Sequence, residues 1–132
     1  MKITLLVQTL KIIFFLLLPF QVLAQDSALN RQVMRSHPNG KDHVVLYFDA
    51  KTNELAKEEV FYPSGKIEWS GYYKKNLESG LWKFYYTNGN LRVQETYLNG
   101  KEHGVSTEYD ENGKKVKESY WKNGKLLKEL TF

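Results

Sequence analysis

The sequence contains no cysteine among its 132 residues. This absence excludes a disulfide framework, a thiolate zinc site, an iron–sulfur cluster and a cysteine nucleophile. It also excludes a bacterial lipoprotein anchor, which requires a cysteine at the cleavage site. Aromatic residues make up 14% of the chain, whereas disordered chains are poor in aromatics. We therefore expect one small folded domain.

The chain also lacks an uninterrupted apolar run of the ~20 residues that a membrane-spanning helix needs. It begins instead with a short positive start, an apolar run over 12–18 and small residues before a cut after Ala24. This pattern is typical of a cleaved secretory signal peptide over residues 1–24. The alternative is an uncleaved membrane anchor, lengthened by the apolar residues 3–7. We predict export to the periplasm or the cell exterior.

A strong excess of positive charge is missing as well. The formal net charge is +4, and Lys2 and Lys11 lie in the predicted signal peptide, so residues 25–132 carry only +2. Lysines gather near Tyr120 and Trp121, which could indicate nucleic-acid or headgroup binding, but glutamates are interspersed among them. We predict no nucleic-acid partner. Membrane contact is expected only through the signal peptide or a weak peripheral contact.

Motifs for catalysis or cofactor binding are absent. The sequence has no nucleophile elbow, phosphate-binding loop, dinucleotide fingerprint or EF-hand loop. The histidines His37, His43 and His103 lack metal-site spacing. Adjacent acids at 58–59 and 110–111 point to opposite faces of a strand, so neither pair forms a two-carboxylate site. We predict a non-enzymatic protein without cofactor or metal.

An internal repeat is present instead. Asn-Gly occurs five times, and from Asn88 onward the spacings are 11, 13 and 11, which gives a period of 24. Asn-Gly between runs of β-branched and aromatic residues predicts β-hairpins with type I′ turns. An overlay by 24 residues superposes aromatic columns. The predicted structural positions are Gly65, Tyr73, Gly80, Tyr85, Gly89, Tyr97, Gly100, Gly104, Tyr109, Gly113, Trp121 and Gly124.

The segments between turns alternate apolar and polar residues, as half-buried strands do. They predict an all-β fold over residues 41–132, an open twisted antiparallel meander of repeated ~24-residue β-hairpins. About eight strands are expected: 44–49, 56–62, 66–73, 80–86, 90–98, 104–109, 114–121 and 125–132. Residues 25–40 are predicted as an N-terminal loop or, over 26–36, a short helix.

Aromatic side chains outside the regular columns are the candidate binding residues, because an uncovered aromatic patch marks an interaction site. These candidates are Trp69, Tyr72, Trp82, Tyr86 and Tyr120. The alternative is that they form a second face packed on the N-terminal strands. The sheet edges offer another contact, to which a partner strand could add.

The run over 80–91, GLWKFYYTNGNL, and the run over 97–104, YLNGKEHG, resemble the bacterial variant of the MORN repeat. The match covers about residues 60–128 well and 40–60 poorly. The resemblance implies an open sheet of hairpins and brings no catalytic residue. Bacterial proteins with this variant are often labelled antitoxins, and eukaryotic relatives are linked to membranes and scaffolding.

These observations lead to one functional hypothesis with two alternatives. The first is an exported, non-enzymatic module that binds a protein through its aromatic sheet face or an edge strand. The second is an envelope adaptor that binds lipid headgroups or glycan. The third is an exported antitoxin or immunity-type protein, whose toxin would be met outside the cytoplasm.

Overall fold

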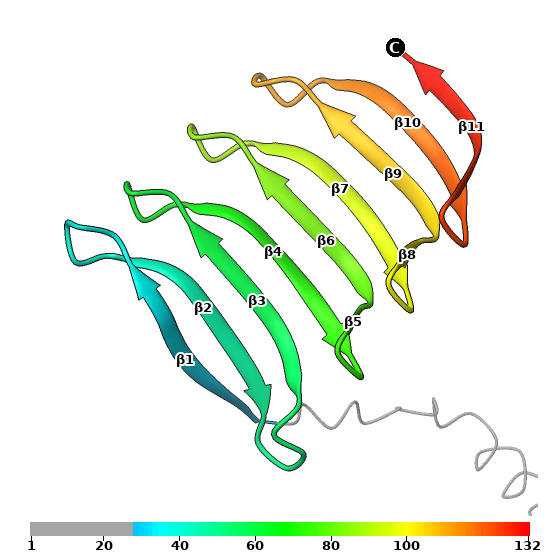
Figure 1. Ribbon diagram of the computed structural model, residues 1–132. Coiled ribbons are helices and arrows are strands. Elements are labelled where there is room, and N and C mark those ends of the chain that lie inside the picture. The colour runs from blue at the N-terminus through cyan, green and yellow to red at the C-terminus, as the bar shows by residue number, and fades with distance from the viewer. Residues whose placement is uncertain (1–27) are drawn as a thin grey trace, which may run out of the picture.

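The computed structural model describes residues 28–132, and every regular element in that range is a strand of one antiparallel sheet (Figure 1). The predicted signal peptide, residues 1–24, lies outside the described residues. The strands are β1 (Leu29–Ser36), β2 (Asp42–Asp49), β3 (Leu55–Phe61), β4 (Ile67–Lys74), β5 (Leu77–Glu78), β6 (Gly80–Tyr85), β7 (Leu91–Leu98), β8 (Lys101–Glu102), β9 (Gly104–Tyr109), β10 (Lys115–Lys122) and β11 (Lys125–Thr131).

Neighbouring strands in the sheet follow one another along the chain, in the order β1-β2-β3-β4-β6-β7-β9-β10-β11. The short strands β5 and β8 pair with the ends of β4 and β7. The sheet is open, with β1 and β11 at its two edges (Figure 1). This arrangement confirms the predicted all-β meander of hairpins, because each strand turns back onto the one before it.

The N-terminal segment differs from its prediction as a loop or short helix over 25–40. Its described part forms β1, which pairs with β2 from Leu29 opposite Asp49 to Ser36 opposite Asp42. All eight residues of β1 are exposed. An edge strand of a single-layer sheet buries neither face fully, so its sequence need not show clear alternation. The conformation of β1 is instead determined by its backbone hydrogen bonds to the outer edge of β2.

The hairpins use two kinds of turn. At Asn99-Gly100 both residues have positive φ, 52° and 75°, as the predicted type I′ turn requires, and Asn123-Gly124 is alike. In the Asn-Gly pairs at 39–40, 88–89 and 112–113, only the glycine has positive φ. In each of these turns, the glycine N–H donates a hydrogen bond to the carbonyl oxygen of the residue three positions before it. The prediction of type I′ turns is therefore wrong at these three pairs.

Successive turns of this second kind are joined through the first residue of each turn. A ring nitrogen of His37 lies 2.7 Å from the carbonyl oxygen of Phe61. The hydroxyl of Tyr62 donates to the carbonyl of Tyr85 (2.7 Å), and that of Tyr86 donates to the carbonyl of Tyr109 (2.8 Å). The series ends at Asp110, whose carboxylate instead accepts N–H groups of its own turn. We call these three contacts the turn ladder.

The sheet has one layer within residues 28–132, so few side chains are deeply buried. The buried apolar residues are Val45, Val60 and Trp82. The aromatic residues of the regular columns are half-buried: Tyr73, Tyr85, Tyr97, Tyr109 and Trp121. The predicted glycines all have positive φ: Gly65, Gly80, Gly89, Gly100, Gly104, Gly113 and Gly124. The buried apolar residues lie on β2, β3 and β6, and Val45 of β2 is the most deeply buried of them.

Candidate functional site

Five aromatic side chains gather on one face of the central strands. Directly opposite residues of antiparallel strands share a face, and Trp69 of β4 lies opposite Phe84 of β6. Alternation along β4, β6 and β7 places the other members on the same side. We call this set the aromatic face: Trp69, Tyr73, Trp82, Phe84 and Tyr97.

Trp82 is the centre of the aromatic face. Its ring stacks on Trp69 with centroids 5.3 Å apart and planes 16° apart. Tyr73 meets it edge-on at 5.4 Å, and Tyr97 is tilted against it at 5.6 Å. The indole lies over Gly71, where an added Cβ would come within 2.2 Å of a ring atom. Trp82 is therefore buried because its neighbour on β4 has no side chain.

Two carboxylates flank this ring cluster. Glu58 of β3 lies opposite Gly71, and Glu95 of β7 lies opposite Trp82. The hydroxyl of Tyr73 donates to Glu58 at 3.0 Å, and that of Tyr97 donates to Glu95 at 3.0 Å. Within residues 28–132 neither carboxylate forms an ion pair. Each is held only by a neutral donor from the aromatic face.

Burial changes the electrostatics of this site. Burial raises the pKa of Glu95, and repulsion from Glu102 and Glu108 adds to the effect, although the Tyr97 hydroxyl opposes it. Burial, reinforced by the Glu58 carboxylate, raises the pKa of Tyr73 well above its ordinary value. Burial, reinforced by the Glu95 carboxylate, likewise raises the pKa of Tyr97, so both tyrosines stay neutral hydroxyl donors at physiological pH.

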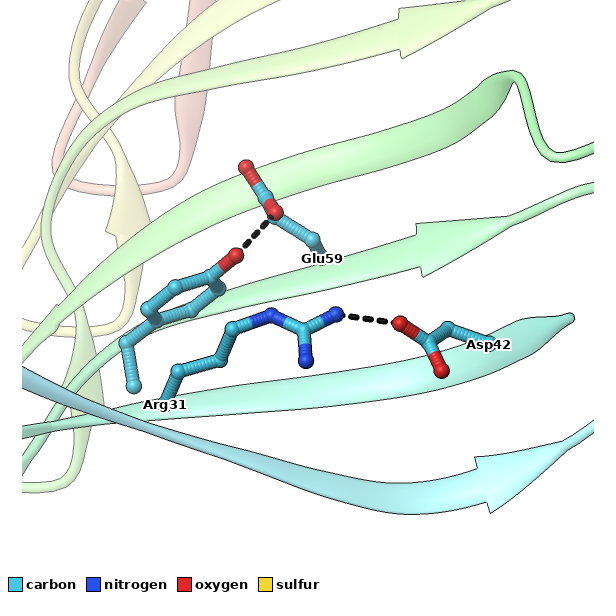
Figure 2. Close-up of polar contacts among 4 residues, drawn as sticks. Arg31, Asp42 and Glu59 are labelled. Carbon is cyan, nitrogen blue, oxygen red and sulfur yellow. Dashed lines mark hydrogen bonds and ion pairs between the residues drawn. The ribbon is translucent and has the colours of Figure 1, made fainter.

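The opposite face has its own cations. Near β2, Lys57 forms an ion pair with Glu59 at 2.6 Å. The Tyr47 hydroxyl donates to the same carboxylate at 2.6 Å, a contact drawn in Figure 2. The Lys57 ammonium lies 5.2 Å from the centroid of the Tyr47 ring and 5.8 Å from that of Tyr72. We call these residues the lysine cluster: Tyr47, Lys57, Glu59 and Tyr72. Within this cluster, the lysine ammonium already has a carboxylate partner and two nearby aromatic rings.

A similar group lies near the C-terminal edge. Lys115 pairs with Glu118 at 2.6 Å, the Tyr120 hydroxyl bonds Glu118, and Lys128 lies 5.6 Å from the Tyr120 ring centroid. Alternation along β10 puts Tyr120 on the face opposite Ser119 and Trp121. The Tyr120 ring thus has a cation from its own chain.

The structure separates the five predicted binding residues. Trp69 and Trp82 lie on the aromatic face, but Trp82 is only 7% exposed, which contradicts its prediction as an exposed contact. Tyr72 and Tyr120 lie on the opposite face beside lysines. Tyr86 belongs to the turn ladder. The five do not form one surface: Trp69 is half-buried on the aromatic face, and Tyr72 is exposed on the opposite face.

Sequence reasoning missed Glu58 and Glu95. The 24-residue overlay aligns Glu95 with Gly71 and Ser119, so its column has no constant chemistry. Glu58 likewise aligns with Trp82. The signal that could have found them is hairpin register, which sets Glu58 opposite Gly71 and Glu95 opposite Trp82.

A hollow lies on another part of the sheet, and the charged side chains that line it are paired with groups of the same chain. It has a volume of about 400 Å³ and is lined by Arg31, Gly40, Lys41, Asp42, Phe61 and Gly65. Arg31 pairs with Asp42 (Figure 2), and the Lys41 ammonium donates to the carbonyl of Ser64 at 2.6 Å. Residues 28–132 contain no cluster of three potential metal ligands and no helix long and apolar enough to cross a membrane.

Comparison with known proteins places the repeats in a family. The family model described as "MORN repeat variant" matches residues 78–99, 102–123 and 116–132. Residues 78–132 are MORN-variant repeats. MORN repeats suggest a repeat-based binding or scaffold module, and all-β folds built from them are typically non-enzymatic.

Other comparisons add little. No curated protein matches the chain. A solved structure described as "Crystal Structure of TarM" is similar, with 15% identity and a TM-score of 0.38 over 76% of this chain. The match spans 21% of that structure's chain, about a fifth of its length. The MORN-variant repeats therefore carry the family assignment.

Proposed function

We propose that this MORN-variant protein is an exported, non-enzymatic module that binds a protein partner through its aromatic face. One observation carries the proposal: five aromatic rings gather on one side of a single-layer sheet, and no other element within residues 28–132 covers them. Tryptophan and tyrosine lead among the residues that anchor protein interfaces.

The placement of the two carboxylates favours binding over hydrolysis. Glu58, Gly71, Trp82 and Glu95 occupy successive strands in one row. Three inter-strand spacings separate the two acids, which is about 14 Å. Paired carboxylates in glycosidases stand about 5–9.5 Å apart. The backbone spacing of the two acids is thus wider than these carboxylate separations, and Trp82 occupies the row between them.

The edges of the sheet are a second possible contact. β1 exposes Leu29, Val33 and Met34, and the C-terminal end exposes Leu126, Leu127 and Phe132. An open edge can accept a partner strand. Register shifts interrupt both edge strands, between Val33 and Ser36 and at Tyr120 opposite β11, so neither edge is a regular template. We therefore favour the aromatic face.

The proposal is tested by affinity capture with the full chain from the envelope fraction of the source cells. Trp69→Ala removes a half-buried ring of the aromatic face, and Tyr72→Ala removes a ring on the opposite face of the same strand. We expect a protein that the wild type and Tyr72→Ala both capture and that Trp69→Ala loses. Equal capture by both variants, or capture of lipid or glycan alone, would contradict the proposal.

Export is tested separately by N-terminal sequencing of the protein recovered outside the cytoplasm. A start at Gln25 is expected if the predicted signal peptide is cleaved. A start at Met1 would contradict cleavage. If the captured partner is a toxin whose activity is blocked by the complex, the same binding face serves an immunity function.

A further inference from the structure

We propose that the aromatic face binds an extended, positively charged protein segment, whose lysine or arginine side chains lie near Glu58 and Glu95. This inference rests on the proposed function and names the chemistry of the partner. Its basis is a contrast between the two faces of the same sheet, which differ in whether their rings and carboxylates have cations.

The rings of the aromatic face have no cation of their own. Residues 28–132 contain four cation–ring contacts, made by Lys57, Lys115 and Lys128. They involve Tyr47, Tyr72, Tyr120 and Phe132, none of which belongs to the aromatic face. Electron-rich faces of tryptophan and tyrosine attract ammonium and guanidinium groups. The aromatic face therefore offers this attraction to a cation from outside.

The carboxylates show the same contrast. The ion pairs within residues 28–132 use Asp42, Glu59, Glu108, Glu118 and Glu129. Glu58 and Glu95 are each bonded by a tyrosine hydroxyl alone. A carboxylate has two oxygens and about four acceptor positions, so each acid retains capacity for a charged donor. Charge complementarity thus points to a cationic partner and disfavours acidic peptides and phosphate headgroups.

The geometry sets a spacing for the partner. Glu58 and Glu95 stand three strand spacings apart, about 14 Å. An extended chain advances about 3.3 Å per residue, so side chains four residues apart point the same way and lie about 13 Å apart. A segment crossing the strands with basic residues at i and i+4 can reach both acids. The residue at i+2 then lies over the Trp69 and Trp82 rings.

The test uses a defined peptide, acetyl-Gly-Lys-Ser-Leu-Ser-Lys-Gly-amide, added to the full chain labelled with nitrogen-15. The chain has three tryptophans, so the indole N–H signals are resolved individually by NMR. We expect the Trp69 and Trp82 signals to shift and the Trp121 signal to stay. A peptide with both lysines acetylated, and one with the lysines adjacent, should bind at least about fivefold more weakly.

Variants test the role of the two acids. The double variant Glu58→Gln with Glu95→Gln should weaken peptide binding by about tenfold or more. The matched control, Glu54→Gln with Glu111→Gln, removes the same charge away from the aromatic face and should change binding less than twofold. Both control glutamates are exposed and lie outside the strands. Thermal unfolding of each variant establishes that it is folded.

The outcomes separate this inference from the proposed function. Equal binding of the acetylated peptide, an equal effect of both double variants, shifts confined to Trp121, or absence of binding would overturn the cationic-segment inference. If Trp69→Ala still abolished capture of a partner, the proposed function would stand with another chemistry, such as a neutral glycoprotein or a second copy of this chain. If the peptide does not bind and Trp69→Ala captures the same proteins as the wild type, both proposals are overturned.

Discussion

At the scale of single residues, the key feature is the match between Gly71 and Trp82. Gly71 is the one glycine within residues 28–132 without positive φ, so the backbone does not require glycine there. The requirement comes from the indole, which occupies the space a Cβ would fill. This position explains why an aromatic ring can be buried in a sheet of one layer.

Gly71→Ala is expected to lower stability by about 1–3 kcal/mol, because the indole must move. Thermal or urea unfolding measures the loss. Combining Gly71→Ala with Trp82→Leu provides the control, since a smaller side chain at position 82 removes the clash. The two changes should then be less than additive. Strict additivity would show that the Gly71–Trp82 contact does not determine stability.

A second prediction at this scale concerns Glu95 and pH. Its folded-state pKa is raised, so between the ordinary and the raised value the folded protein binds more protons than the unfolded chain, and stability rises as pH falls through that window. Glu95→Gln removes this cost and should raise Tm at pH 7 by about 2–4 °C. The difference should vanish below the ordinary glutamate pKa. Glu54→Gln is the control, and a Tm decrease at pH 7 would contradict the account.

At the scale of elements, the turn ladder ties one hairpin to the next through side chains. The hydroxyl of Tyr86 reaches the carbonyl of Tyr109, one repeat further along the sheet. Asp110 caps its own turn instead, so the ladder ends there. The ladder adds side-chain hydrogen bonds to the backbone pairing of the strands.

Tyr86→Phe should lower stability by about 0.5–1.5 kcal/mol, because it leaves a part-buried carbonyl without this donor. Tyr72→Phe is the matched control, since the Tyr72 hydroxyl makes no hydrogen bond within residues 28–132. Denaturant unfolding compares the two variants. Equal stability of both would mean that water replaces the ladder bond at no cost.

Much of the element structure could be predicted from the sequence, because Asn-Gly pairs and alternating side chains are local signals. The eight long strands from β2 onward and their meander order follow from these signals, whereas the two-residue strands β5 and β8 were not predicted. β1 could not be predicted, since an edge strand exposed along its length carries no burial pattern. The face of the sheet on which a side chain lies was harder to predict than the strands. Tyr72 and Tyr73 are neighbours in sequence, yet register alone shows that only Tyr73 joins the aromatic face.

At the scale of the whole molecule, the protein is an array whose repeats are not chemically equal. The central strands β4, β6 and β7 carry the aromatic face, whereas the corresponding row in β9 and β10 holds Ser106 opposite Ser119. The overlay by 24 residues predicted the array correctly and hid this difference. The rings of the aromatic face are thus confined to one part of an otherwise regular sheet.

Deleting residues 110–132 should preserve the Trp69–Trp82 cluster, because its ring contacts all lie within β4, β6 and β7. Stability in repeat arrays comes from individual repeats and their neighbour contacts, so Tm should fall by about 5 °C or more. Near-ultraviolet circular dichroism should retain the tryptophan signal. Its complete loss would show that the cluster depends on the entire array.

The central claim is that a partner docks on the aromatic face, and site-specific photocrosslinking in the source cells tests it most directly. p-Benzoylphenylalanine placed at Trp69 samples that face, and at Tyr72 it samples the opposite face of the same strand. The account predicts a protein adduct at position 69 and none at position 72. An adduct at position 72 alone, equal adducts at both, or no adduct at position 69 would contradict it.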